Sequence, residues 1–282
     1  MGILSGLDQF GLGNLENADL YATPKNENGE NSEAPKEPEE KDFLFDKTYT
    51  CPVCDHEFKT KTVKVGKAKL LGTDMDLRPK YDKIDSLKYD IILCPHCGYA
   101  SLSRYFKVIT TPQAKLVKEN ISKGFKPLPE KEIYSYDDAM ERYKLALANA
   151  IVKRGKASEK AYICLKMAWL ARGKKEQLDV TDPTYDEQVR RCEADEMEML
   201  KSTLEGFISA RQSESFPMCG MDEVTVDYLI AVTAAKFEKY DIAAKLISNI
   251  LLSSNANARM KDKARDLKEQ ILSERKHMKE NS

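Results

Sequence analysis

Two stretches of sequence decide the fold: TYTCPVCDHEF, residues 48–58, and KYDIILCPHCGYASL, residues 88–102. Each contains a Cys-Pro-x-Cys motif, Cys51-Pro-Val-Cys54 in the first and Cys94-Pro-His-Cys97 in the second. Such a motif makes a tight turn that directs two sulfurs to one point, and four thiolates are the usual ligands of a closed, tetrahedral zinc site. We therefore predict that Cys51, Cys54, Cys94 and Cys97 hold one structural Zn²⁺ ion per chain.

The spacing of the two motifs is compatible with this prediction. The 39 residues between them form a long insert, but the entropy of closing a loop grows only slowly with its length. The alternatives are two disulfides, free thiols or an iron–sulfur centre. A thioredoxin-like redox site would need a single motif in a βαβ context. His56 and His96 are expected to point away from an ion whose four positions are filled by cysteines.

The sequence around the motifs predicts a small antiparallel β domain at residues 43–110. Between residues 58 and 72, Val, Thr and Leu alternate with Lys, which is typical of short strands. Gly66 and Gly72 mark a bulge and a turn. The same stretch carries a stripe of five lysines without an acidic residue among them, which could meet phosphates or could protect exposed strand edges: Lys59, Lys61, Lys64, Lys67 and Lys69.

The segments on either side of this domain have different compositions. Residues 1–42 become acidic and rich in Pro, Glu and Asn, and such a segment cannot bury enough apolar surface to offset its ordering entropy, so we expect a disordered tail. Beyond Pro112 the periodicity becomes helical, and residues 111–282 are expected to form an α-helical, tetratricopeptide-like domain. The predicted fold class is therefore α+β.

Six or seven helices are predicted in this second domain. Ser135 is a suitable N-cap for one of them, and Gly155 and Gly173 are suitable C-terminal stops. Residues 226–253 resemble one tetratricopeptide unit, with Ala231 and Ala243 at the helix crossing; an ordinary helical hairpin is the alternative. The predicted spans are 113–123, 137–154, 158–172, 183–211, 222–239, 241–253 and 258–279.

The chain carries no familiar catalytic motif. It contains no Gly-rich phosphate loop, no GxSxG and no HExxH. The three remaining cysteines, Cys164, Cys192 and Cys219, are predicted to be small buried hydrophobic residues. Asp74 and Asp76 form a close carboxylate pair that we interpret as a turn feature. We therefore expect a protein that is not an enzyme.

Charge and hydropathy restrict the partners. The 45 basic and 46 acidic residues give a net charge of −1, so the chain as a whole has no field that attracts nucleic acid or an anionic membrane. No run approaches the roughly 20 apolar residues of a membrane-spanning helix, and the N-terminus lacks a signal-peptide pattern. We expect a cytoplasmic protein without a membrane partner.

A resemblance to a known family supports this organisation. Cys51-Pro-Val-Cys54, Asp74-Met-Asp76 and the stretch from Tyr89 to Ala100 resemble the uncharacterised bacterial proteins called domain of unknown function 2225, and the likeness continues through residues 168–170, 217–222 and 228–230. The resemblance implies a zinc-ribbon segment fused to tetratricopeptide-like helices and brings no established activity. Many family members carry Gly where this chain has Asp55, so we expect Asp55 in a left-handed conformation, and many carry Cys in place of Arg78.

Two functional hypotheses follow. The first is an adaptor or scaffold, in which zinc stabilises a β module and the helical domain binds a protein or peptide. The second is a nucleic-acid-associated zinc ribbon that uses the lysine stripe.

Overall fold

The computed structural model describes residues 37–280, and the chain from Pro38 onward forms one compact unit. Most of the predicted disordered tail lies outside the described residues. The residues around its predicted end at residue 42, Glu40–Phe43, form a 3₁₀ turn, and Glu40 accepts hydrogen bonds from Lys88 (2.8 Å) and Tyr89 (2.7 Å). The predicted boundary between residues 110 and 111 falls at Thr110, the N-cap of the first α-helix.

Three antiparallel hairpins make up the β part within residues 37–280. Their strands are β1 (Leu44–Thr50) with β2 (Glu57–Val63), β3 (Leu70–Thr73) with β4 (Pro79–Tyr81), and β5 (Ile91–Leu93) with β6 (Ala100–Leu102). Gly66 lies in the turn before β3 with a φ of 75°, and Gly72 lies beside the register shift of the β3–β4 hairpin. A turn and a bulge are therefore both present, but at exchanged positions, because the prediction placed the bulge at Gly66 and the turn at Gly72.

Seven α-helices follow in the described chain, so the α+β prediction is confirmed. Each lies within a few residues of its predicted position, and Ser135 caps α2 through the amide of Asp138. Their bounds are α1 Thr111–Val117, continued by a π turn at Lys118–Ser122, α2 Tyr136–Val152, α3 Ala157–Glu176, α4 Tyr185–Ser213, α5 Glu223–Lys236, α6 Tyr240–Leu252 and α7 Ala258–Glu280.

One predicted helix end is wrong. Gly173 was expected to stop α3, but the helix continues to Glu176. The glycine instead allows Tyr136 of α2 to approach, because a Cβ at this position would lie 2.7 Å from the Tyr136 ring. Gly155 does close α2, donating its amide to the carbonyl of Ala150 (2.8 Å).

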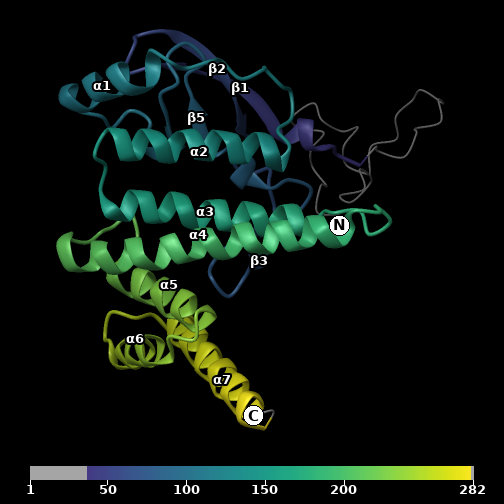
Figure 1. Ribbon diagram of the computed structural model, residues 1–282, viewed down its shortest axis with the longest axis vertical. Helices are drawn as coiled ribbons and strands as arrows, with labels where there is room; N and C mark the ends of the chain where they lie inside the picture. The colour runs from purple at the N-terminus through teal and green to yellow at the C-terminus, as the bar shows by residue number, and fades with distance from the viewer. Residues whose placement is uncertain (1–36, 281–282) are drawn as a thin grey trace, which may run out of the picture. The chain divides into compact units, whose positions relative to one another are not determined.

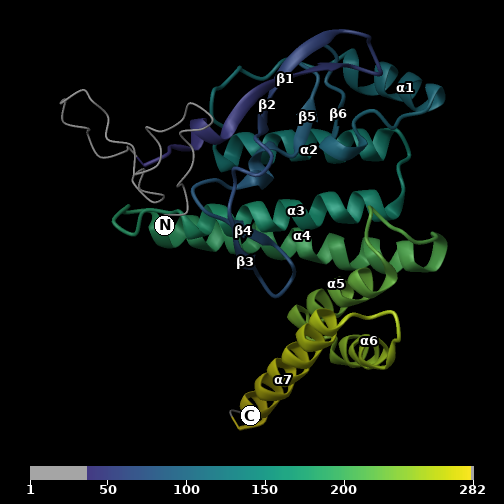
Figure 2. The ribbon, with the colours of Figure 1, turned by 180° about the vertical axis from the view of Figure 1, so that it is seen from behind.

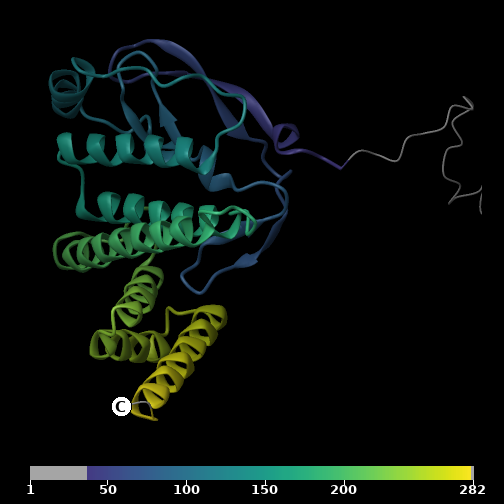
Figure 3. The ribbon, with the colours of Figure 1, turned by 45° about the vertical axis from the view of Figure 1, so that its right-hand side comes forward.

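The elements stack in layers (Figure 1). The β1–β2 and β5–β6 hairpins and α1 lie over α2, the pair α3 and α4 lies beneath α2, and α5 to α7 form the far end (Figure 3). The largest hydrophobic cluster runs through all these layers, from Leu93 of β5 to Ile271 of α7. The β3–β4 hairpin runs past α3 and α4 toward α5 (Figure 2), where Tyr228 donates a hydrogen bond to the carbonyl of Met75 (2.9 Å).

Helices α5 and α6 form the predicted hairpin. Ala231 and Ala243 are both completely buried, as small residues at a helix crossing must be when two backbones approach closely. None of the described helices is both long enough and apolar enough to cross a bilayer.

Candidate metal centre

The two Cys-Pro-x-Cys motifs occupy equivalent places in two hairpins. One forms the loop 51–56 between β1 and β2, and the other forms the loop 94–99 between β5 and β6. The first cysteine of each loop donates its amide to the last residue, Cys51 to His56 (2.9 Å) and Cys94 to Tyr99 (2.9 Å). The same local folding therefore presents both cysteine pairs.

A left-handed residue follows each second cysteine. Asp55 has a φ of 59° and Gly98 a φ of 73°, which confirms the conformation expected for Asp55. Each of these residues turns its amide back to the first cysteine, at 2.9 Å from Asp55 to the Cys51 carbonyl and 3.1 Å from Gly98 to the Cys94 carbonyl. Asp and Gly are among the residues that tolerate this conformation best.

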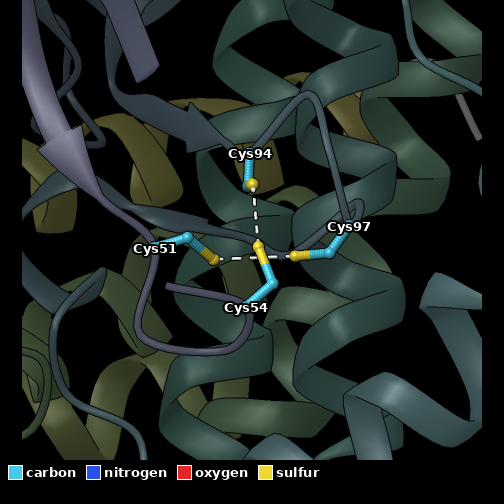
Figure 4. A group of neighbouring side chains, drawn as sticks. All are labelled: Cys51, Cys54, Cys94 and Cys97. Atoms are coloured by element: carbon cyan, nitrogen blue, oxygen red, sulfur yellow. Dashed lines mark hydrogen bonds between the residues drawn. The ribbon is translucent and has the colours of Figure 1, made fainter. Parts of the chain in front are cut away.

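The four predicted cysteines converge on one point (Figure 4). All four sulfurs lie within 4.8 Å of one another. The Sγ atoms of Cys51 and Cys97 are 3.6 Å apart, and those of Cys54 and Cys94 are 3.7 Å apart. Cys51, Cys94 and Cys97 are buried, and Cys54 is partly exposed. The pairs lie far beyond the roughly 2.05 Å of a disulfide bond, so the cysteines are thiols.

This geometry fits a single tetrahedral ion. Four sulfurs at about 2.3 Å from a Zn²⁺ ion lie about 3.8 Å from one another, close to the two spacings given above. An iron–sulfur cluster places several irons and sulfides between its cysteines, and so needs sulfurs that stand farther apart. The cysteine cluster can therefore hold one metal ion that prefers tetrahedral sulfur ligands.

The electrostatics also favour a cation. Hydrogen bonds from the thiols of Cys51 and Cys97, followed by backbone amides, lower the pKa of Cys94 far below its usual range. The pKa values of two other cysteines shift in the opposite direction. The hydrogen bond to Cys94 raises the pKa of Cys51, and the hydrogen bonds to Cys51 and Cys94 raise that of Cys97. Four thiolates this close repel one another unless a positive ion lies between them, so metal binding and release of the remaining protons are coupled.

An aromatic cluster surrounds the cysteines and closes the site toward the protein. Tyr49, Phe58, Tyr99 and Phe106 pack with Cys51, Cys94 and Cys97 in one hydrophobic cluster. Tyr99 is completely buried and donates its hydroxyl to the carbonyl of Phe106 (3.1 Å). Water therefore has little access from this side.

His56 and His96 lie on the outer side of the centre. Both are exposed, and their rings stack with centroids 4.0 Å apart and an angle of 2° between the planes. Neither belongs to the group of side chains that could hold the ion. This arrangement agrees with the prediction that they flank the site.

The second loop is fixed to the helical part by a residue that the sequence did not single out. Asn149 of α2 is completely buried and donates its side-chain amide to the carbonyls of Gly98 (2.9 Å) and Leu145 (2.9 Å). On the other side, a Cβ at Gly98 would lie 2.5 Å from the Phe125 ring. Nothing in the local sequence of Asn149 marks this role, because its partner is 51 residues away.

Asp74 and Asp76 lie far from the cysteines, in the loop between β3 and β4, as the turn interpretation predicts. They bind Arg172 of α3, Asp76 through Oδ2 at 2.6 Å and Asp74 through Oδ2 at 3.0 Å. Arg172 also binds Glu196 of α4 (2.7 Å). We call these four residues the Arg172 cluster, and its role is to fasten the hairpin to the helices. Arg78 binds Glu176 of α3 (2.9 Å), so it also holds the β3–β4 hairpin to the helices.

Two of the five lysines of the stripe bind other groups of the protein. Lys61 pairs with Asp46 across the β1–β2 hairpin (3.0 Å), and Lys64 donates to the carbonyl of Asp42 (2.8 Å). Lys59, Lys67 and Lys69 are exposed.

The other three cysteines are separate from the centre. Cys164 and Cys192 are buried, as predicted, and Cys219 is partly exposed. Burial raises the pKa of Cys164 and that of Cys219 to about 11, and it also raises the pKa of Cys192. Since the thiolate is the reactive form, none of these thiols is primed for nucleophilic chemistry at neutral pH.

Comparison with known proteins identifies the family. Residues 44–271 match the model of an uncharacterized protein conserved in bacteria, DUF2225, and because the match covers most of the chain, the protein belongs to this family. Neither the curated proteins nor the solved structures contain a match.

Proposed function

We propose that this DUF2225 protein is a non-enzymatic adaptor, in which Cys51, Cys54, Cys94 and Cys97 hold one structural Zn²⁺ ion and the helices bind a protein partner. The observation that carries the proposal is the closed cysteine cluster, with four sulfurs within 4.8 Å of one another and three of the four cysteines buried. Catalytic zinc sites usually have three protein ligands and keep a position open for water, whereas structural sites use four.

The position of the cluster supports a structural role. It joins the β1–β2 hairpin to the β5–β6 hairpin, and within the described part of the chain each of these sheets has two strands. An isolated two-stranded hairpin is marginally stable in water. An ion that binds both loops would therefore contribute directly to the folding free energy of the β part.

The far end of the helical part supports the protein partner. Large apolar side chains are exposed on the last two helices, Ile242 (36% exposed) and Leu252 (86%) on α6 and Leu272 (57%) on α7. Exposed apolar side chains on the terminal helices of a helical stack are common at protein–protein contacts. The nucleic-acid hypothesis remains a prediction, and two of its five lysines are engaged within the protein.

Metal analysis of the purified protein tests the first half of the proposal. We expect one zinc per chain in protein purified without added metal, and its loss in the Cys51→Ser, Cys94→Ser double variant. Cys164→Ser is the matched control, because this thiol is buried outside the cluster and its substitution should leave the zinc content unchanged. Iron in place of zinc, or no metal at all, would contradict the structural-zinc proposal.

Cross-linking in cells followed by mass spectrometry tests the second half. A partner that cross-links to the wild type and is lost in an Ile242→Lys, Leu252→Lys, Leu272→Lys variant with normal zinc content supports the adaptor. If the same proteins cross-link to the wild type and to this triple variant, the α6–α7 surface, defined by Ile242, Leu252 and Leu272, does not bind the partner. RNA or DNA that cross-links to the wild type but not to the Lys59→Glu, Lys67→Glu double variant would instead support the nucleic-acid hypothesis.

A further inference from the structure

A cavity of about 730 Å³ lies beside strand β2; none of the four cysteines lines it, although Phe58 and Pro95, which adjoin the metal centre, do. Five consecutive strand residues, 57–61, line the cavity together with residues 128–132 and Arg142 of α2. Successive side chains of a strand point to opposite faces, so a cavity that touches five in a row follows the edge of the strand. In the described part of the chain, β2 pairs only with β1, which leaves the backbone groups of its other edge without a strand partner.

Arg142 is buried in this cavity without a carboxylate in ion-pair contact, although the charge of Asp138 on the same helix acts on it. Only 8% of the residue is exposed, and burial lowers the pKa of the guanidinium. Its Nη2 donates to the hydroxyl of Thr60 (3.2 Å), and its plane lies over the Tyr134 ring at 4.4 Å from the centroid. Among residues 37–280, the buried Nε has no hydrogen-bond partner and no carboxylate forms an ion pair with the side chain.

The other buried basic residues make Arg142 an exception. Each of them has a carboxylate within hydrogen-bond distance: Glu176 at 2.9 Å from Arg78, Glu40 at 2.6 Å from Lys88, Glu159 at 2.6 Å from Lys153 and Asp90 at 2.7 Å from Lys166. A buried charge without a partner is costly. A cost of this kind at the wall of a cavity is typical of a site that is completed by a ligand.

The surrounding charges indicate a ligand with a single negative charge. The lysines that line the cavity are Lys59, Lys61 and Lys131. Two of them already form ion pairs, Lys61 with Asp46 (3.0 Å) and Lys131 with Asp138 (2.6 Å). Glu57, Glu130 and Glu132 line the same cavity and would repel a polyanion. The fork of guanidinium N–H groups matches the planar geometry of one carboxylate.

We propose that this cavity binds an extended peptide, which adds to the free edge of β2 and places a carboxylate on Arg142. The strand edge supplies main-chain hydrogen bonds, as in other cases of β-strand addition, and Arg142 supplies the selectivity. The carboxylate belongs either to an acidic side chain or to the C-terminus of the peptide. This cavity is lined by none of the four cysteines and by no residue of α6 or α7, so the inference goes beyond the proposed function.

Fluorescence anisotropy with three labelled pools of nonapeptides built from Val, Thr and Ser tests the site. The first pool is amidated and has no acidic residue, the second is amidated and has a central glutamate, and the third has a free C-terminal carboxylate. We expect the second or the third pool to bind at least tenfold more tightly than the first, because a charge-assisted hydrogen bond is worth about tenfold or more in affinity. The pool that binds identifies the source of the carboxylate.

Two variants separate the site from general charge. Arg142→Met should weaken binding of the acidic pool at least tenfold, while Lys144→Met, which removes an exposed charge from the same helix, should leave it unchanged. Both variants should keep the zinc content of the wild type, so a failed metal site and a failed peptide site are distinguishable.

A measurement on the wild type serves if Arg142→Met does not fold. Sodium acetate should shift the Nε–H resonance of Arg142 in arginine-labelled protein, with the assignment made through Arg142→Lys, and inorganic phosphate at equal concentration should shift it less. Equal binding of the three pools, binding of none, undiminished binding by Arg142→Met, or a stronger response to phosphate would each overturn the proposal.

Discussion

The substitution Arg172→Met should be among the most destabilising single changes outside the metal centre. Arg172 joins Asp76 of the β3–β4 loop to Glu196 of α4, with contacts of 2.6 and 2.7 Å. The side chains of Asp76 and Glu196 are only 3% and 8% exposed, and Met fills much of the volume of the arginine stem without its charge. Asp76 would then lie buried without an ion-pair partner among the described residues, and Glu196 would keep only its longer contact to Lys236 (3.8 Å).

The expected loss follows from this burial. Removing one partner of a buried ion pair costs about 3–5 kcal/mol, because the remaining charge is left uncompensated. The matched control is Arg191→Met on α4, where the arginine side chain is 75% exposed and pairs with Glu187 of the same helix. Such a surface pair contributes at most about 0.5 kcal/mol.

Urea unfolding measures this loss. Trp169 is the only tryptophan of the chain and is buried one helical turn before Arg172, so its fluorescence reports this region directly. The triple variant Arg172→Met, Asp76→Asn, Glu196→Gln should recover part of the loss, because no charge is left buried without a partner. A loss below about 1 kcal/mol, or a triple variant as unstable as the single one, would refute the assignment of the Arg172 cluster as the fastening of the hairpin.

Four further predictions concern the metal centre, its supports and the Arg172 cluster. In urea unfolding, Asp55→Gly should stabilise the protein by about 0.5–1 kcal/mol and Asp55→Val should destabilise it. Position 55 has a φ of 59°, which glycine adopts without strain and a β-branched residue does not. Equal stabilities of the two variants would contradict this prediction. Asn149→Ala should cost about 1–3 kcal/mol and speed the transfer of zinc to a chelator, since the buried Gly98 carbonyl loses its donor, whereas exposed Lys144→Ala should change neither. Complete chelation should abolish the near-ultraviolet circular dichroism of Tyr49 and Tyr99, which pack around the cysteines, while most helical signal remains; tyrosine signals that persist would show that the β part folds without metal. Burial raises the pKa of Asp74, but the charges and hydrogen bonds of Lys80 and Arg172 outweigh burial, and the net effect is a lowered pKa. The stability that this group contributes is therefore present above its unfolded pKa of about 3.9 and is lost as the pH falls through the lower, folded pKa. The Asp74→Asn variant should therefore lose less stability than the wild type between about pH 5 and pH 3.

Local sequence determined the metal centre and the elements of the fold. The Cys-Pro-x-Cys motif folds within six-residue loops, 51–56 and 94–99, so its geometry needs no distant information and all four cysteines could be named in advance. The helices could be placed for a related reason, because apolar periodicity and N-caps such as Ser135 act over only a few residues. Gly173 was misread because a glycine that ends a helix and a glycine that admits a neighbouring ring look alike in one sequence.

Tertiary structure alone decided how these parts are joined. Arg172 meets Asp76 across 96 residues of chain and Asn149 meets Gly98 across 51, and neither pair leaves a periodic signal in the sequence. The isolation of Arg142 could not be foreseen either, since an arginine on a helix normally reaches solvent or a carboxylate. Its burial arises only because β2 and residues 128–134 close around it. The sequence by itself therefore specified which groups can hold a metal ion, whereas the packing of distant segments decided which charges are paired and left Arg142 buried without an ion pair.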